Sequence, residues 1–261
     1  MWLTLRSSAP ILFSMKAASS YRTDLAYIHA CGFASHATHA SRQLIEQLAK
    51  LGIRTGRVVD LGCGSGVLAG HMAGRGYDVH GIDISKAMIQ LARKRVPSAR
   101  FSVGSFLDAE IPSCVAVTAM GECFNYVFDP RNSVSRLRSV FRRIFRSLQP
   151  GGLLLFDIAT PARIASKASV SGRIESHDWT VLVTSKKLPG GEVLVRQITT
   201  FRKVGKLYRR DSETHKLLLL DAKSIARLLS EIGFSVRLVH SYSGMPLLPG
   251  VVGFLARKPG S

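Results

Sequence analysis

Val58-Val59-Asp60-Leu61-Gly62-Cys63-Gly64-Ser65-Gly66 is the stretch that decides the fold of this chain. Its first four residues are typical of the end of a buried strand, and residues 67–72 are typical of the start of a helix. Glycine lacks a Cβ atom and tolerates positive φ, so the turn lets the backbone approach a nucleotide-like ligand. The helix N-terminus would then offer its free N–H groups. A tight turn without a ligand is the alternative.

An acidic residue follows the next expected strand. Residues 77–82 are strand-like and end at Asp83, about twenty residues after the glycine turn. A carboxylate there can accept charge-assisted hydrogen bonds from both hydroxyl groups of a ribose. Dinucleotide-binding turns carry the pattern G-x-G-x-x-G, whereas Val67 stands here in place of the last glycine. The spacing therefore disfavours NAD and pyrophosphate binding.

These two features resemble the class I S-adenosylmethionine (SAM)-dependent methyltransferases, whose motifs are a strand ending in acid-x-G-x-G-x-G and an acid at the end of the next strand. The resemblance runs from about Arg54 to the C-terminus. It implies an α/β fold with a Rossmann-like seven-stranded sheet in the order 3-2-1-4-5-7-6, strand 7 antiparallel, flanked by helices. It also implies SAM as cofactor and S-adenosylhomocysteine as product. The residues expected at the cofactor are Asp60, Gly62, Cys63, Gly64, Gly66, Asp83, Ile84, Met88, Ser105, Phe106 and Gly121.

The adenine end of this site departs from the family pattern. The family often places an aspartate after the third strand, here residues 100–104, but this chain has Ser105 followed by Phe106. Serine can make one hydrogen bond to adenine, and Phe106 can cover the ring by stacking. Asp108 can supply the missing acid, or it can merely begin a helix.

The loop after the fourth strand, residues 114–119, is expected to border cofactor and acceptor, because ligands bind at the carboxyl ends of parallel strands. It lacks the N-P-P-Y and Pro-Cys segments that the resemblance associates with amino- and cytosine-C5-methyltransferases. Glu122 can act as a base or hold an acceptor amine, or it can cap the following turn. Asn125 and Tyr126 are candidate substrate-binding residues.

Residues 161–220 depart from a minimal methyltransferase core. Their strand-like segments are 180–183, 192–201 and 206–220. We predict a three-stranded antiparallel lid, similar to the insertion over the acceptor in bacterial small-molecule methyltransferases, including sugar N-methyltransferases. Period-2 alternation places Glu213 and His215 on one face of the last strand. His215 is the predicted general base if that face looks into the pocket; otherwise the two residues form a surface pair.

The N-terminal part has two expected segments. Residues 1–20 are expected to be a disordered leader, with Met15 an alternative start, and residues 21–53 a helical lid. Tyr27 and Phe33 are candidate pocket walls, although packing on the core explains them equally well. The histidines of this segment lack the spacing of metal ligands, and we predict no metal site.

Composition bounds the remaining possibilities. The chain has 261 residues and a formal net charge of +19. Four cysteines without a C-x-x-C pair favour a reducing, cytoplasmic location. The densest basic block, residues 131–146, carries six arginines. The apolar residues of this region predict one buried helix face: Leu137, Phe141, Ile144 and Leu148. We therefore interpret the arginines as a solvated face with weak polyanion binding.

The sequence thus predicts a methyltransferase core over 54–160, the lid over 161–220, and a C-terminal helix and β-hairpin over 221–261. The predicted activity is methyl transfer from SAM to an N or O atom of a small-molecule acceptor. The basic charge keeps an RNA- or protein-modifying methyltransferase open as an alternative. A non-catalytic SAM-binding module is the second alternative.

Overall fold

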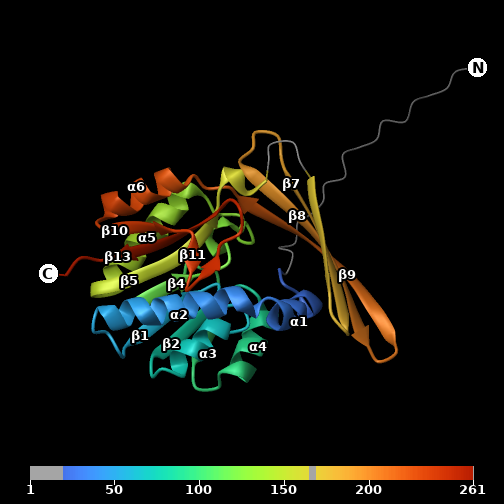
Figure 1. The fold of residues 1–261 in the computed structure, drawn as a ribbon, viewed down its shortest axis with the longest axis horizontal. Coiled ribbons are helices and arrows are strands. Elements are labelled where there is room, and N and C mark those ends of the chain that lie inside the picture. The colour runs from blue at the N-terminus through green and yellow to red at the C-terminus, as the bar shows by residue number, and fades with distance from the viewer. Residues whose placement is uncertain (1–19, 165–168, 261) are drawn as a thin grey trace, which may run out of the picture.

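A seven-stranded sheet forms the centre of the molecule (Figure 1). Its strands are β1 (Arg57–Leu61), β2 (Asp78–Asp83), β3 (Arg100–Val103), β4 (Cys114–Ala119), β5 (Leu148–Ala159), β10 (Ser235–Val239) and β13 (Val251–Arg257). They lie in the order β10-β13-β5-β4-β1-β2-β3. Only β13 among them runs antiparallel to its neighbours, β5 and β10. The predicted strand order and the reversed strand are confirmed.

The computed structural model describes residues 20–164 and 169–260. The leader expected over residues 1–20 therefore lies outside the described residues, apart from Ser20. No helix in the described part is both long and apolar enough to cross a membrane.

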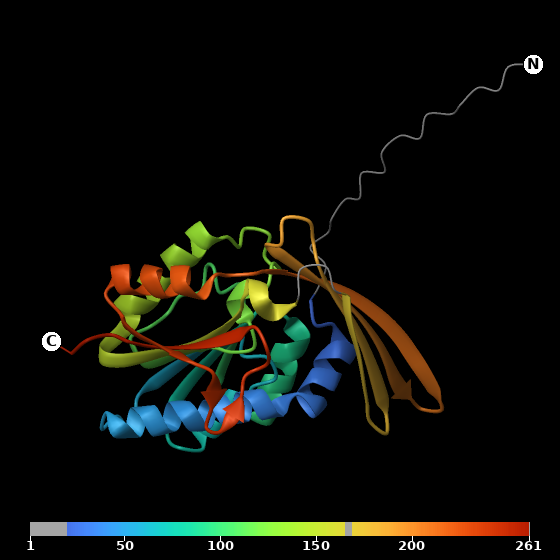
Figure 2. The same cartoon turned by 45° about the horizontal axis from the view of Figure 1, so that its top comes forward.

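Helices cover both faces of the sheet (Figures 1 and 2). One face carries α2 (Ala34–Lys50), α3 (Val67–Ala73) and α4 (Lys86–Arg95), and the other carries α5 (Val134–Ser147) and α6 (Ala222–Ile232). Because successive residues of a strand point to opposite faces, Val58 packs in the cluster with α2 and α3, and Val59 packs in the cluster with α5 and α6. The central strands are apolar on both sides for this reason.

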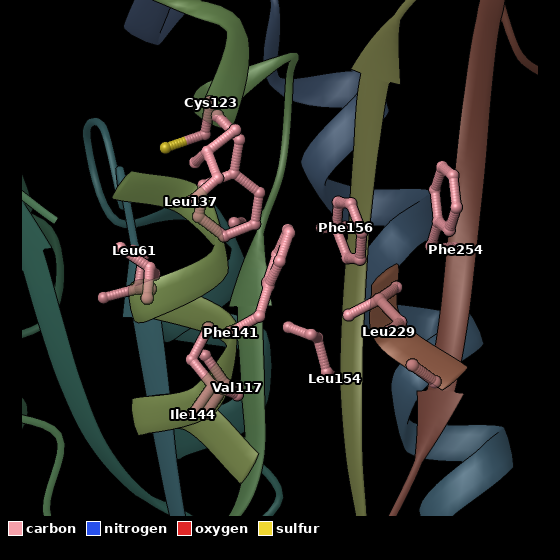
Figure 3. Packing of buried hydrophobic residues seen from close by; sticks show 14 of the residues in the cluster. Leu61, Val117, Cys123, Leu137, Phe141, Ile144, Leu154, Phe156, Leu229 and Phe254 are labelled. Carbon is pink, nitrogen blue, oxygen red and sulfur yellow. The ribbon is translucent and has the colours of Figure 1, made fainter. Parts of the chain in front are cut away.

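Aliphatic side chains and a group of phenylalanines fill the layer between the sheet and helices α5 and α6 (Figure 3). Phe156 on β5 stacks on Phe254 of β13 with ring centroids 4.6 Å apart, and its centroid lies 5.5 Å from that of Phe141 on α5. All three side chains are fully buried. The apolar face predicted for α5 is the face that packs, since Leu137, Phe141 and Ile144 are buried. Leu148, the fourth expected member, is also buried but is the first residue of β5.

The lid is a second antiparallel sheet that projects from one side of the core (Figure 2). Its strands are β6 (Ser169–Glu175), β7 (Trp179–Lys187), β8 (Val193–Val204) and β9 (Leu207–Leu218), in sequential order. The prediction of three strands missed β6. All seven residues of that edge strand are exposed, and Gly172 interrupts it, so its sequence carries no buried alternation.

The N-terminal helices join the lid sheet to the core. α1 (Thr23–Gly32) packs Leu25 and Ile28 against Trp179, Val181 and Ile198 of the lid. α2 begins at Ala34 and continues over the core sheet. Short elements complete the fold: η1 (Cys123–Asn125), η2 (Pro161–Arg163), β11 (Ser241–Tyr242) and β12 (Met245–Pro246).

We expect Phe156→Ala to lower the free energy of unfolding by about 3–5 kcal/mol, because it removes a ring that touches neighbours on three elements and leaves a cavity. Urea denaturation measures the loss. Leu207→Ala is the control, because Leu207 is 77% exposed and its truncation should cost no more than about 0.5 kcal/mol. Equal losses for the two variants would contradict the assigned core.

Candidate active site

The glycine turn between β1 and α3 presents bare main chain to a cavity. Gly62, Gly64 and Gly66 have φ of 68°, 53° and 75°, values that favour glycine. A Cβ atom on Gly62 would lie 2.4 Å from Sγ of Cys123, so no larger residue fits there. The corresponding space at Gly64 is open, and Gly64 lines the cavity. Gly66 instead turns the chain into α3 and does not line it.

Asp83, at the end of β2, holds this turn in place. Its Oδ2 accepts a hydrogen bond of 2.9 Å from the N–H of Gly64, and its Oδ1 accepts one of 2.8 Å from the N–H of Ser85. Burial raises the pKa of Asp83, although these two hydrogen bonds lower it in part. The carboxylate therefore lines the cavity beside the glycine turn, where it can accept further hydrogen bonds.

Asp60, at the end of β1, is a second buried acid on the cavity wall. The hydroxyl group of Thr118 donates to it at 2.6 Å. Burial raises the pKa of Asp60 to about 7; the Thr118 hydrogen bond opposes this shift, and the nearby charge of Asp83 adds to it. Asp60 therefore titrates near neutral pH.

Asp129, and not the Asp108 suggested by the sequence, is the acid on the β3 side of the cavity. Ser105 and Phe106 line the cavity there, as do Ile84 and Met88 from the turn and helix after β2. Asp108 is exposed and pairs with Arg131. Asp129 lines the cavity instead. Hydrogen bonds from Arg131 and Ser105 outweigh the effect of burial and lower the pKa of Asp129 to about 2.

These groups form one end of a cavity of about 600 Å³. The other end is walled by α1, the residue after it and the lid sheet, and their contributions are mainly apolar: Leu25, Phe33, Val181, Val183 and Ile198. The volume lies within the usual range of small-molecule sites. One enclosure therefore joins the glycine turn of the core to the inner face of the lid.

Glu122 is a buried ion-pair partner on this wall. Arg196 of β8 contacts it at 2.6 Å and Arg163 of η2 at 3.2 Å. Burial alone would raise the pKa of Glu122, but the charges and hydrogen bonds of the two guanidinium groups outweigh it and lower the pKa. A carboxylate paired with two cations is a weak base. Of the roles expected for Glu122, the geometry therefore favours holding the acceptor over accepting its proton. Gly121, next to it, also lines the cavity.

Two other sequence-predicted substrate residues lie outside the cavity wall. The side chain of Asn125 hydrogen-bonds to main-chain groups: Nδ2 donates to the carbonyls of Ala159 and Leu218, and Oδ1 accepts from the N–H of Ala159. The hydroxyl group of Tyr27 donates a hydrogen bond to Asp178. Phe33 and Tyr126 do line the cavity, and Tyr126 accepts a hydrogen bond of 3.0 Å from Arg196.

His215 and Glu213 lie on one face of β9, as the alternation predicts. Nε2 of His215 is 2.9 Å from a carboxylate oxygen of Glu213. Glu213 also accepts hydrogen bonds of 2.8 Å from the N–H groups of Tyr21 and Arg22. The His215 ring is buried behind Tyr21 and Phe128 and does not line the cavity. Its role as the base stays a prediction, and its contacts suit a residue that positions Tyr21.

The structure also brings together residues that the sequence reasoning missed. His36 of α2 lines the cavity and pairs with Asp157 of β5, 121 positions away in the sequence. Asp157 ends an apolar run in β5, at the same edge as Asp60 and Asp83, and that placement was a usable signal. Nothing in the sequence near His36 points to its partner. The described residues hold no group of three or more His, Cys, Asp or Glu that could bind a metal ion.

We expect Asp60→Asn to change how the stability of the ligand-free protein depends on pH. Between about pH 4 and pH 7 the unfolded chain has lost the Asp60 proton while the folded protein keeps it, so the wild type loses stability as pH rises through this range. The variant should lack this component, a difference on the order of a few kcal/mol by urea denaturation. Asp78→Asn, at the exposed start of the neighbouring strand, is the control. Parallel stability curves for wild type and Asp60→Asn would contradict the assignment.

Known proteins share this fold and this site region. A family model described as a methyltransferase domain matches residues 58–152. A Bacillus subtilis (strain 168) protein named as a methyltransferase, YqeM, is 26% identical over 189 residues, which cover 70% of this chain and 75% of that protein.

Two solved structures are similar over most of the chain. An S-adenosylmethionine-dependent methyltransferase from Clostridium acetobutylicum has a TM-score of 0.75 at 18% identity and covers 90% of this chain and 97% of its own. The SAM-bound amino pentose methyltransferase CalS10 from Micromonospora echinaspora has a TM-score of 0.70 at 21% identity and covers 89% and 94%. The chain therefore contains a methyltransferase domain over residues 58–152 and is a SAM-dependent methyltransferase, and its strand order is the one expected for the class I fold.

Proposed function

We propose that this enzyme moves the methyl group of SAM to an N or O atom of a small molecule bound beneath the lid sheet. One observation carries the proposal: the glycine turn and Asp83 share a single cavity with the inner face of the lid. A donor held at one end and an acceptor held at the other would meet without leaving this enclosure. Such positioning can supply roughly 7–11 kcal/mol of the barrier to methyl transfer.

The residues at the glycine-turn end fit an adenosyl group. Asp83 can accept from the ribose hydroxyls, and the missing Cβ of Gly64 leaves room for the nucleoside. We assign the adenine to the stretch of wall with Met88, Phe106 and Asp129, which offers an apolar surface and one carboxylate acceptor. When bound, SAM supplies an electrophilic methyl group, and the electron pair of the broken C–S bond stays on sulfur.

The lid end fits an acceptor with an apolar body. Its walls are mainly aliphatic and aromatic, so a bound acceptor with an apolar body would displace water from this end. Polar groups meet at one corner, where Arg196 pairs with Glu122 and donates to the hydroxyl of Tyr126. These groups can orient one polar substituent of the acceptor.

The arrangement disfavours a polymer acceptor. The acceptor end lies beneath α1 and the lid sheet. Part of the basic block after β4 is also committed within the molecule: Arg143 donates to the carbonyls of Phe106 and Leu107, and Arg138 pairs with Glu231. The remaining surface charge suits weak polyanion binding.

Asp83→Ala should weaken SAM binding at least tenfold, because it removes up to two charge-assisted hydrogen bonds to the ribose and frees the Gly64 main chain. Isothermal titration calorimetry with SAM measures the effect. Asp78→Ala is the matched control: it lies at the other end of the same strand, where its carboxylate pairs with Arg57 and Arg100. Unchanged SAM affinity in Asp83→Ala would remove the ribose assignment.

Val183→Trp should lower kcat/KM for the acceptor at least tenfold and leave SAM affinity unchanged, because an indole there fills the lid end of the cavity. The acceptor is first identified by transfer of a labelled methyl group to metabolite extracts. Leu182→Trp is the control, since its side chain is adjacent on β7 but exposed and outside the cavity wall. Normal kcat/KM in Val183→Trp would place the acceptor elsewhere. SAM affinity without transfer to any extract would favour a non-catalytic module.

A further inference from the structure

His36 and Asp157 form a hydrogen-bonded pair on the cavity wall. Nε2 of His36 lies 2.9 Å from Oδ2 of Asp157. The Asp157 side chain is fully buried, whereas that of His36 is 32% exposed and lines the cavity. The pair therefore has a buried anchoring member and a member that a bound acceptor can reach.

Main-chain donors fix the Asp157 carboxylate. The N–H groups of Gly121 and Glu122 donate to its two oxygens at 3.1 and 2.5 Å, and the hydroxyl of Tyr242 lies 3.5 Å from Oδ2. The carboxylate cannot rotate without giving up these bonds. It thus accepts from the His36 ring in one orientation only.

This contact selects the tautomer of the ring. An ionised carboxylate only accepts hydrogen bonds, so Nε2 of His36 must carry the hydrogen in the bond to Asp157. In the neutral ring, the lone pair then resides on Nδ1. Within the described residues the His36 ring hydrogen-bonds through Nε2 alone, so Nδ1 is free to accept a proton, and the side chain lines the cavity. A buried carboxylate that orients a histidine in this way is a general feature of histidine bases.

The surroundings of the ring strengthen it as a proton acceptor. The titratable and charged groups around it are Asp157 of β5, Glu122 after β4, His29 of α1, Tyr242 of β11, and Arg163 and Arg196, which pair with Glu122. Burial lowers the pKa of His36, but the hydrogen bond and charge of Asp157, with the charge of Glu122, outweigh it and raise the pKa. Burial lowers the pKa of His29 to about 4, so that ring is neutral beside His36.

We propose that Nδ1 of His36 is the general base of the reaction and that the acceptor is an aromatic hydroxyl compound. The inference rests on the proposed function and names its acceptor class. The acceptor proton moves from the hydroxyl oxygen to Nδ1, and the oxygen keeps the electron pair that forms the new bond to the methyl carbon. Asp157 stabilises the resulting imidazolium, which afterwards returns the proton to solvent.

The chemistry favours a hydroxyl over an amine. A neutral amine attacks with its own lone pair and can lose a proton after the methyl group has arrived, so it needs no base in the cavity. A hydroxyl group must lose its proton as the new bond forms, so a base beside it speeds the transfer. A phenol, with a pKa of about 10, is within reach of a histidine base, whereas an aliphatic alcohol is a far weaker acid. The aliphatic and aromatic walls suit the ring of a phenol.

The test compares His36→Gln with the wild type on two probes of similar size, catechol and 1,2-phenylenediamine, an aromatic amine that is neutral near pH 7. We expect His36→Gln to lower kcat for catechol about 10²–10⁴-fold, because glutamine cannot take up the proton. SAM affinity by calorimetry should stay within about twofold. In the wild type, kcat for catechol should rise with pH through the pKa of His36 and then level off.

Two variants provide the comparison. His39→Gln is the matched control, because His39 lies one turn further along α2, does not line the cavity and, among the described residues, hydrogen-bonds to Ser35; its kcat should equal that of the wild type. His215→Gln tests the competing base. The inference is overturned if His215→Gln removes the rise of kcat with pH while His36→Gln keeps it. It is also overturned if the SAM-binding wild type methylates the amine but neither binds nor methylates catechol.

A second readout needs neither cofactor nor turnover. Imidazole signals in the NMR spectrum of the ligand-free protein report the titration of each histidine, and His36→Gln assigns the signal. We expect the His36 pKa to lie above the usual value of about 6.5, with hydrogen on Nε2 in the neutral ring. A neutral ring with hydrogen on Nδ1 would overturn the inference. A wild type that does not bind SAM would instead overturn the proposed function. Failure of the proposed function is therefore distinguishable from failure of this inference.

Discussion

The parallel register of the central strands is the constraint on which the rest of this molecule depends. It brings Asp60, Asp83 and Asp157 to one edge of the sheet, where β1, β2 and β5 end. Burying an ionised carboxylate is costly unless hydrogen-bond donors surround it. Here the donors come mainly from the turns themselves, such as the N–H groups of Gly64 and Gly121. The loops of the site are therefore shaped around acids that the strand register has already placed.

Tyr21 connects this edge to the lid. Its N–H donates to Glu213 of the lid sheet, and its carbonyl accepts from the Ser85 hydroxyl, each at 2.8 Å. Its backbone has a φ of 50°, an uncommon conformation for a residue with a side chain, and both hydrogen bonds hold it there. Its ring also lines the cavity. A single residue thus contacts the lid, the turn after Asp83 and the space between them.

Local patterns were sufficient to predict much of this structure. The glycine run and Asp83 predicted a turn and a carboxylate side by side, because adjacent parallel strands end at the same edge, and both line the cavity. The apolar spacing in α5 predicted its buried face. β6 was missed because an exposed edge strand needs no apolar alternation, and Asp129 was missed because its approach to Ser105 depends on the path of a loop.

His215 and His36 show where sequence reasoning reaches its limit. Alternation correctly paired His215 with Glu213, but it cannot tell which aromatic rings stand between that pair and the cavity; Tyr21 and Phe128 do so here. The pairing of His36 with Asp157 depends on how α2 crosses the sheet, and no local signal contains that information.

The two N-terminal helices are attached to different parts of the molecule. α1 is held to the lid by the apolar contacts of Leu25 and Ile28 and by the buried Asp24, which pairs with Arg202 and the half-exposed Arg209. α2 is held to the core by its apolar face and by the bond from His36 to the fully buried Asp157. Because Asp157 also fixes the Gly121 loop, a displacement of the lid that moves α1 would leave His36 aligned with the edge of the sheet that carries Asp60 and Asp83.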